Sequence, residues 1–383
     1  MVRRSRLSKS EHYRWVQGDA ELADVCQQWL TSPVIAVDTE FVRTETFHAR
    51  LGLIQIGIEQ QVWLIDPLTI ENWQPLQQVF TDPNIIKVFH ALSEDAEVIK
   101  HSVGVLLVNV FDTQIAAALL GYPLQVSYAK LVEDVCGETI SKEETRSDWV
   151  ARPLSALQCE YAAADVLWLY QVYKQVAEQL KQMDRYAWVQ EDSERQVANN
   201  LPVEPEQYYL KLRGGWKLKG KALFALKQLA AWRERRAREE NCNRGQILQD
   251  KELIQLVERM PITKSDLQYR IKLSPRKIRK YADTIMEIMA TAETIDRQQW
   301  PDKIDGPLPA DQSDVLKKVR QLINDICQQH NIPPEVVAKR KQLESWLRSG
   351  CRNGEYIVPD VFNGWRHDYI VEPICQLLEQ QGS

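Results

Sequence analysis

The feature that most constrains this chain is a short apolar segment that runs directly into two acidic side chains. Residues 34–37 are all apolar, which is typical of a buried strand, and Asp38 and Glu40 follow them. Because side chains alternate faces along a strand, both carboxylates project from the same face. Like charges held side by side are unfavourable without a cation, so the segment favours a divalent metal such as Mg²⁺ or Mn²⁺. A strand end with two solvated acids is the alternative that this segment alone leaves open.

The composition is that of an ordinary globular protein, with 44% hydrophobic and 26% charged residues in 383 positions. This length suits two or three domains. The seven cysteines are scattered and form no Cys-x-x-Cys pair, which argues against zinc or a disulfide framework and favours a reducing cytoplasm. The basic N-terminus has no apolar stretch behind it, so neither a signal peptide nor a membrane span is expected.

Charge is distributed unevenly along the chain. Residues 1–210 hold 17 lysines and arginines against 30 aspartates and glutamates, a net charge of −13. Residues 211–280 hold 20 against 7, a net charge of +13. This asymmetry predicts a polyanion-binding module attached to a metal-dependent one. A solvated helical surface is the simpler reading of the basic block.

Hydrophobic periodicity predicts a mixed sheet covered by helices, because three strands in meander are followed by strands that alternate with helices. From about residue 128 to residue 182 the chain is expected to be mostly helical, with a polar loop over 138–152. The expected strands cover 34–41, 52–58, 61–67, 85–90 and 106–111, and the expected helices cover 19–30, 93–101, 113–120 and 155–182.

Two proline-bearing segments divide the chain. Residues 199–206 form a boundary, because the segments beyond it have helical periodicity with short polar turns. Residues 296–311 interrupt this periodicity again. The chain is therefore expected to consist of an α/β domain over 1–206 and two all-helical domains over 210–292 and 312–380. The similar size of the two helical blocks predicts an internal repeat.

Two further acidic positions complete a possible metal site. Asp95 lies in the first turns of the helix expected after the fourth strand, and Asp165 lies on the long helix 155–182. Tyr161 precedes Asp165 by four residues, so the two share one helical face, and the three alanines between them leave room for close approach. Taken singly, Asp95 also suits a helix N-terminus, and Asp165 and Tyr161 also suit a helix surface and a core aromatic.

In this order Asp38, Glu40, Asp95, Tyr161 and Asp165 resemble the exonuclease motifs of the DEDDy class of 3′-to-5′ exonucleases. The sequence segments around them resemble those of bacterial ribonuclease D. The segment 229–239 resembles the HRDC domain, a helical module shared by RecQ-type helicases and ribonuclease D. The segments that carry the resemblance are Asp38-Thr-Glu-Phe-Val-Arg43, Gly52-Leu-Ile-Gln-Ile56, Asp112-Thr-Gln114, Arg146-Ser-Asp-Trp149, Arg152-Pro-Leu154 and Cys159-Glu-Tyr-Ala-Ala-Ala-Asp-Val166.

The resemblance implies a ribonuclease H-like α/β exonuclease domain followed by two HRDC-type domains. It also implies two-metal phosphodiester hydrolysis with two Mg²⁺ or Mn²⁺ ions. Tyr161 would orient the attacking water. Asp38 would bridge the ions, Glu40 and Asp165 would bind one, and Asp95 would bind the other, mostly through water.

Other residues are interpreted from their surroundings. Asp112 is expected to cap a helix, His90 to be hydrogen-bonded in the core, and Trp232 to be a core residue with Arg233, Arg235, Arg236 and Arg238 outside. Contacts to nucleic acid are predicted for Phe41, Lys142, Arg146, Arg152, Arg233, Arg236, Arg276 and Lys277.

We therefore predict a cytoplasmic, monomeric 3′-to-5′ exoribonuclease without a membrane segment. Its substrate would be RNA with a free 3′ end, and the resemblance implies tRNA precursors with 3′ extensions. Two alternatives stay open: a DNA 3′-exonuclease of the same class, and a catalytically silent RNA-binding scaffold. The presence of all five motif positions argues against the silent scaffold.

Overall fold

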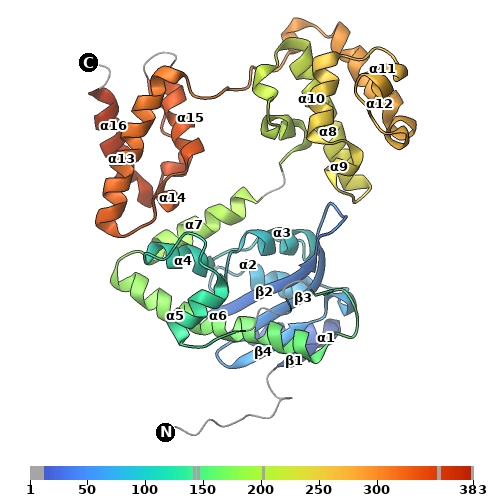
Figure 1. The fold of residues 1–383 in the computed structure, drawn as a ribbon. Helices are drawn as coiled ribbons and strands as arrows, with labels where there is room; N and C mark the ends of the chain where they lie inside the picture. Colours follow the sequence, from blue (N-terminus) through green and yellow to red (C-terminus); the bar gives the residue numbers. More distant parts are fainter. Residues whose placement is uncertain (1–12, 141–143, 145–146, 201–202, 352–354, 381–383) are drawn as a thin grey trace. The chain divides into compact units, whose positions relative to one another are not determined.

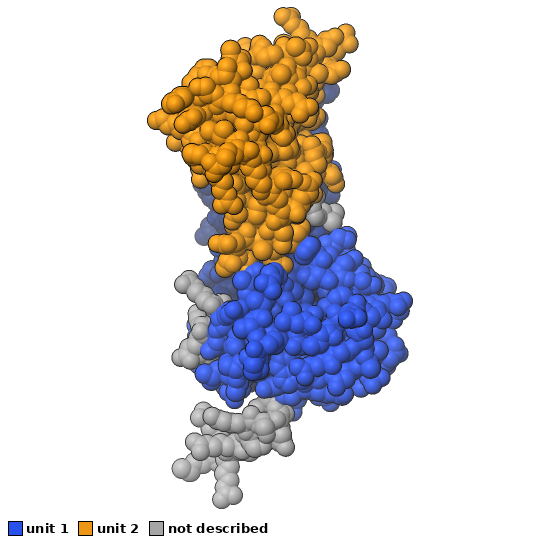
Figure 2. Space-filling view, turned by 90° about the vertical axis from the view of Figure 1, so that its right-hand side faces the viewer, with its two compact units in different colours: residues 1–42, 50–201, 308–383 blue, residues 43–49, 202–307 orange. Residues whose placement is uncertain are grey.

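The computed structural model describes residues 13–140, 144, 147–200, 203–351 and 355–380. Contacts divide the chain into two compact units, coloured blue and orange in Figure 2. Unit 1 contains the described residues of 1–42, 50–201 and 308–383, and unit 2 contains those of 43–49 and 202–307. The last helical block, which comprises the described residues of 308–383, therefore groups with the sheet-containing part of the chain. The boundaries of three separate domains stay a prediction.

Unit 1 is built on a six-stranded mixed sheet with the strand order β1-β4-β3-β2-β5-β6. The meander β2-β3-β4 is antiparallel, whereas β1 runs parallel to β4, and β5 runs parallel to both β2 and β6. This confirms the mixed sheet that the sequence predicts. The strands are β1 (Arg14–Val16), β2 (Val34–Val42), β3 (Arg50–Ile58), β4 (Gln61–Ile65), β5 (Ile86–Phe89) and β6 (Val110–Asp112).

Two strands differ from the prediction. Strand β1 is only three residues long, too short to produce a recognisable alternation. The strand expected over 106–111 is wrong for its first part, because only Val110 and Phe111 of that range belong to β6. The preceding stretch follows Gly104 and includes Asn109, which have φ values of 89° and 53°, and such backbone angles do not continue a strand.

Helices surround this sheet, and the longest of them, α6, packs against β2, β3, β4 and β5. A capping box formed by Ser155 and Gln158 starts α6, and its buried side chains belong to the main hydrophobic core. The helices of this part are α1 (Asp19–Trp29), α2 (Gln74–Thr81), α3 (Ser93–Ser102), α4 (Thr113–Leu119), α5 (Tyr128–Cys136), α6 (Ala156–Gln182) and α7 (Tyr186–Asn199), with the 3₁₀ turn η1 (Pro67–Thr69).

The last helical block packs on α7 through two aromatic rings and a buried ion pair. The rings of Trp188 and Trp365 stack with centroids 4.5 Å apart. The guanidinium of Arg366 donates to both carboxylate oxygens of Asp192, at 2.5 and 2.8 Å, and both side chains are buried. The elements are η5 (Ala310–Gln312), α13 (Ser313–His330), α14 (Pro334–Val337), α15 (Arg340–Gly350), η6 (Asp360–Phe362), the π-helical turn η7 (His367–Val371) and α16 (Glu372–Glu379).

Unit 2 is helical and has its own hydrophobic core. The segment 43–49, which joins β2 to β3, belongs to this unit, because Asn241 Oδ1 accepts hydrogen bonds of 3.2 Å from the N–H groups of Phe47 and His48. Among the described helices of both units, none combines the length and the apolar character needed to cross a membrane. The elements of unit 2 are η2 (Pro205–Lys211), η3 (Gly215–Lys217), α8 (Gly220–Glu239), α9 (Arg244–Ile247), α10 (Asp250–Arg259), α11 (Lys264–Tyr269), α12 (Pro275–Thr294) and η4 (Arg297–Gln299).

Candidate active site

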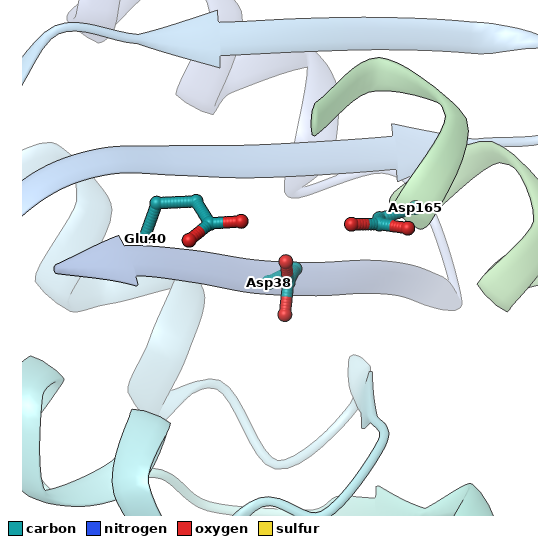
Figure 3. Close-up of side chains that lie close together, drawn as sticks. All are labelled: Asp38, Glu40 and Asp165. Carbon is teal, nitrogen blue, oxygen red and sulfur yellow. The ribbon is translucent and has the colours of Figure 1, made fainter. Parts of the chain in front are cut away.

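Three carboxylates from two elements converge at one face of the sheet (Figure 3). Asp38 and Glu40 project from β2, and Asp165 projects from α6. One oxygen of each carboxylate lies within 4.8 Å of the others, which is close enough for a shared metal ion. Asp38 and Glu40 therefore lie close together on β2, as the strand alternation predicts. Asp165, far along the chain, completes the cluster.

A glycine in β3 allows α6 to approach the sheet at this point. Gly57 pairs with Ala36 of β2, and a Cβ atom placed on Gly57 would lie 2.7 Å from the carbonyl oxygen of Val166. Real Cβ atoms essentially never come this close, so any other residue would displace the helix. Because Val166 follows Asp165 directly, the missing side chain of Gly57 helps to place the Asp165 carboxylate beside Asp38.

Two tyrosines hold Asp165 from opposite ends. The Tyr161 hydroxyl forms a hydrogen bond with the Asp165 side chain, one helical turn away. The Tyr128 hydroxyl, on the first turn of α5, donates to the backbone carbonyl of Asp165. Tyr128 also lies beside His90, with ring centroids 5.3 Å apart. The sequence analysis assigned no role to Tyr128, because nothing in its local pattern indicates a partner on α6.

Asp95 approaches the cluster from α3 and is held by a threonine of β2. The Thr39 hydroxyl donates a hydrogen bond of 2.5 Å to Asp95 Oδ1, and both side chains are buried. Pairing between β2 and β5 ends at Ala36 and Val88, so the edge of β2 beyond Ala36 is open to α3. Asp95 lies outside the group of three converging oxygens but lines the same cavity.

This cavity has a volume of about 270 Å³ and contains all five motif positions. Its mixed lining of carboxylates, hydroxyls and apolar side chains is typical of a substrate site. The lining residues are Asp38, Thr39, Glu40, Phe41, His90, Ala91, Glu94, Asp95, Tyr128, Tyr161, Asp165 and Leu169.

Burial and mutual repulsion make the carboxylates of this cavity costly to ionise without a cation. Burial, followed by the charge of Asp165, raises the pKa of Asp38 to about 8. Burial and the three neighbouring carboxylates raise the pKa of Glu40 to about 10. Burial raises the pKa of Asp165 to about 7, although its hydrogen bond from Tyr161 acts in the opposite direction. Burial and the charge of Asp38 raise the pKa of Asp95 as well.

The residues present fit a divalent cation. The donors are carboxylate oxygens, which suit hard ions such as Mg²⁺ and Mn²⁺, and the described part of the cavity lining contains no cysteine. A bound cation would remove the repulsion that raises these pKa values and would favour the ionised form of every carboxylate.

Two neighbouring residues have the structural roles that the sequence predicts. Asp112 caps α4 by accepting from the N–H of Gln114 at 2.8 Å, and it also accepts from the N–H groups of Ala91 and Leu92. His90 is hydrogen-bonded through both ring nitrogens, to Thr113 Oγ1 and to a backbone carbonyl, and burial lowers its pKa. Asp112 therefore fixes the turn that joins β5 to α3, and α3 is the helix that carries Asp95.

The residues predicted to contact nucleic acid near this site have different positions. Phe41 lines the cavity, and Lys142 and Arg146 lie outside the described residues. Arg152 instead forms a two-pronged ion pair with Asp66 and donates to the carbonyl of Gly52. Because these protein acceptors occupy its guanidinium, we do not retain Arg152 as a residue that contacts RNA.

In unit 2, the prediction that Arg233 lies outside is wrong. Its side chain is only 1% exposed, and it donates to the carboxylate of Asp250 and to the carbonyl of Leu248. Its side chain is buried because the Leu248 carbonyl and the Asp250 carboxylate accept its hydrogen bonds. The helical periodicity of α8 carries no information about these partners on a later segment. Trp232 is half-buried against Tyr281, in agreement with its predicted role.

The other predicted cations of unit 2 lie at or near the surface. Arg236 is paired with Glu239 and Glu240, Lys277 is paired with Glu252 and is 15% exposed, and Arg276 is exposed on α12. Arg276 is therefore the most accessible of the predicted RNA-contacting residues in this unit.

Comparisons with known proteins extend over nearly the whole chain. Residues 13–181 match the family model for a 3′-5′ exonuclease, residues 223–289 match that for the HRDC domain, and residues 312–374 match that for the C-terminal HRDC domain of ribonuclease D. The chain is 38% identical to ribonuclease D of Pseudomonas paraeruginosa, with 96% of this chain and 97% of that protein covered. It is 33% identical to ribonuclease D of Escherichia coli, with 96% and 99% covered.

A solved structure gives the same result for the fold. The crystal structure of Escherichia coli RNase D, described as an exoribonuclease involved in structured RNA processing, superposes with a TM-score of 0.91 at 32% identity. The match covers 96% of this chain and 99% of that chain.

Proposed function

Because the chain belongs to the ribonuclease D family and is a metal-dependent 3′-to-5′ exoribonuclease, we propose that Asp38, Glu40, Asp95 and Asp165 hold two Mg²⁺ or Mn²⁺ ions. The observation that carries the proposal is the convergence of three carboxylate oxygens within 4.8 Å, with the fourth carboxylate in the same cavity.

The residues divide the work of hydrolysis. When bound, the ions supply an activated water nucleophile and stabilise the charge on the leaving 3′-oxygen. Asp38 would hold both ions, Glu40 and Asp165 would hold one of them, and Asp95 would hold the other. Tyr161, which is hydrogen-bonded to Asp165, orients the attacking water through its hydroxyl. The product is a nucleoside 5′-monophosphate.

The substrate proposed for this site is RNA with a free 3′ end, in particular tRNA precursors with 3′ extensions. The Escherichia coli relative is described as processing structured RNA. The basic block 211–280, with its net charge of +13, supplies cations for sequence-independent contacts with the phosphates of a folded RNA. These contacts should weaken as salt concentration rises.

We further propose that the chain acts as a cytoplasmic monomer composed of an exonuclease domain (1–206) and two HRDC-type domains (210–292 and 312–380). Light scattering coupled to size-exclusion chromatography tests the monomer, and a dimer mass at micromolar concentration would contradict it. Limited proteolysis tests the boundaries, because cleavage should concentrate in the segments between these ranges.

The function is tested by digesting a tRNA precursor that carries a 3′ extension and a 5′ label, beside a DNA strand of the same sequence. We expect a ladder that shortens from the RNA 3′ end with Mg²⁺ or Mn²⁺ and stops with EDTA. Preferential digestion of DNA would move the protein to the DNA exonucleases of the same class. RNA binding without cleavage of either strand would identify a silent scaffold.

A further inference from the structure

A second cavity of unit 1 lies beside the active-site cavity and is not used by the proposed chemistry. It has a volume of about 480 Å³, within the range of about 300–1,000 Å³ that is typical of ligand sites. It shares Ala91 with the catalytic cavity, and Ser93, on the first turn of the helix that carries Asp95, also lines it. We call this cavity the α7–α15 groove, because its walls include residues of α7 and α15.

The groove is lined by an unusual number of carboxamides. Six of its eighteen lining residues are glutamine or asparagine. A carboxamide offers both a donor and an acceptor, which is the pattern that recognises the edges of nucleic-acid bases. The lining residues with carboxamides are Gln114, Gln125, Gln196, Asn199, Asn200 and Gln342.

Half of these carboxamides have no other task. Within the described part of the chain, the side chains of Gln125, Gln196 and Asn199 make no intramolecular hydrogen bond. By contrast, Gln342 accepts from the N–H of Lys339, and Asn200 bonds with Ser93. The three uncommitted side chains are thus available to a ligand.

The charges of the groove are nearly balanced. Arg366 is neutralised by Asp192, and Arg195 is paired with Glu191 and donates to two backbone carbonyls. Lys339 and Glu335 are both exposed on the wall that the last helical block forms. A balanced, amide-rich lining suits bases and riboses more than a run of phosphates, so it favours single-stranded nucleic acid with accessible bases.

The groove is formed before any ligand binds. One wall comes from α4 and α7 of the sheet-containing part, and the other comes from α14 and α15 of the last helical block, with α14 beside α4 in Figure 1. The buried pair of Arg366 and Asp192 and the stacked rings of Trp188 and Trp365 join the two walls. A preformed site avoids the entropic cost of ordering loops on binding.

We propose that the α7–α15 groove binds the unpaired RNA nucleotides that lie immediately 5′ to the nucleotide in the catalytic cavity. This inference rests on the proposed function, because it assumes that an RNA 3′ end occupies that cavity. The groove and the catalytic cavity share Ala91, so a strand that leaves the catalytic cavity past this residue would continue into the groove. The last helical block then helps to select substrates whose 3′ extension is single-stranded and long enough to reach the groove.

The test compares a short and a long substrate in two matched double variants. The groove variant is Gln196→Ala/Lys339→Glu, and the control is Gln179→Ala/Lys341→Glu, which makes the same chemical changes on α6 and α15 outside the groove. For an octaribonucleotide, we expect kcat/KM of the groove variant to fall about 10-fold, equivalent to one or two lost hydrogen bonds. For a diribonucleotide, both variants should stay within about 2-fold of the wild type.

The outcomes separate this inference from the proposed function. If the wild type cleaves both substrates and the groove variant loses no more activity on the octamer than the control, the groove proposal is overturned and the exonuclease assignment stands. Equal losses on the dimer and the octamer would also overturn it, because the effect would then lie in the catalytic cavity. If the wild type cleaves neither substrate, the proposed function itself fails.

A crosslinking measurement does not depend on turnover or on these variants. RNA with 4-thiouridine two to four nucleotides from its 3′ end is bound to the wild-type protein in EDTA and irradiated. We expect crosslinked peptides from α7 and from residues 334–342. Crosslinks confined to unit 2 would contradict the proposed path.

Discussion

The hydroxyl of Thr39 donates a hydrogen bond of 2.5 Å to the carboxylate of Asp95. The residue between the two acids of β2 therefore connects that strand to the acid on α3. Because Thr39 is buried, its hydroxyl needs a partner, and Asp95 provides one. This bond fixes the rotamer of the carboxylate that approaches the cluster from a different element.

Replacing Thr39 with valine should loosen Asp95 without changing the volume of the side chain. We expect kcat on RNA to fall about 10-fold, with a higher concentration of Mn²⁺ needed for half-maximal rate, because an outer hydrogen bond orients a ligand. Thr39→Ser keeps the hydroxyl and should retain most of the activity. A Thr39→Val enzyme with the wild-type rate and the wild-type Mn²⁺ dependence would show that the bond is dispensable.

Gly57→Ala should push α6 away from the sheet beside Asp165. The added Cβ would lie 2.7 Å from the carbonyl oxygen of Val166. Overpacking of this kind costs about 1–3 kcal/mol of unfolding free energy, and hydrolysis should fall more than stability alone explains. Gly245→Ala is the matched control, since a Cβ there meets nothing within 4 Å. Equal behaviour of the two variants in urea unfolding and in activity would refute this account of α6.

Tyr161→Phe removes the hydroxyl that bonds to Asp165 and keeps the ring in place. We expect kcat to fall about 100-fold and the dissociation constant for RNA to change little, because positioning of the water acts in the chemical step. Filter binding in EDTA and single-turnover hydrolysis in Mn²⁺ separate the two effects. A loss confined to RNA binding would assign Tyr161 to substrate contact instead.

Stability should depend on pH through the carboxylates of the cluster. The folded state keeps protons on groups whose pKa values rise to about 8 at Asp38 and about 7 at Asp165, whereas the unfolded chain releases them near pH 4. The folded state therefore binds more protons between these values, and without metal the unfolding free energy falls as pH rises from about 5 to 8. This contribution is present at acid pH and is lost as pH approaches the folded-state pKa.

Comparison with Asp38→Asn isolates this effect from other titrating groups. The variant should gain stability relative to the wild type by about 1 kcal/mol for each pH unit in this range, measured by urea unfolding in EDTA. Mn²⁺ should stabilise the wild type more at pH 8 than at pH 5 and should stabilise the variant much less. Parallel curves for the two proteins would contradict the raised pKa of Asp38.

Asp192→Asn should weaken the attachment of the last helical block. Removing one charge of a buried pair leaves the guanidinium of Arg366 uncompensated, at a cost of about 3–5 kcal/mol. We expect hydrogen exchange to increase in α13 to α16 while cleavage of a diribonucleotide is retained. Lys317→Ala, which breaks the exposed pair with Asp314, should change neither measurement.

Those parts of the candidate site that depend on local periodicity could be predicted from the sequence. The alternation of β2 places Asp38 and Glu40 together, and the helical period places Tyr161 beside Asp165. The contributions of Gly57 and Tyr128 could not be predicted, because each acts through a residue of α6 that is more than thirty positions away. Nothing in the local sequence encodes those distances.

The errors have the same origin. Arg233 is buried because Asp250 and the carbonyl of Leu248 meet its guanidinium, so a tertiary ion pair overrides the polarity of the side chain. Residues 106–109 have the apolar character of a strand, yet the backbone around them leaves the extended region at Gly104 and Asn109. Pattern alone cannot distinguish such a loop from a buried strand.

The most direct test of the metal site is Asp38→Asn, assayed for Mn²⁺ binding by calorimetry and for digestion of a 5′-labelled RNA. The substitution keeps the shape of the side chain and removes the charge shared by the cluster. We predict a cooperatively folded protein that binds Mn²⁺ at least about 10-fold more weakly and hydrolyses RNA at least about 1,000-fold more slowly, because catalysis and metal affinity depend on the same carboxylate. A folded Asp38→Asn protein that trims RNA at the wild-type rate would contradict the assignment of these carboxylates as the catalytic metal site.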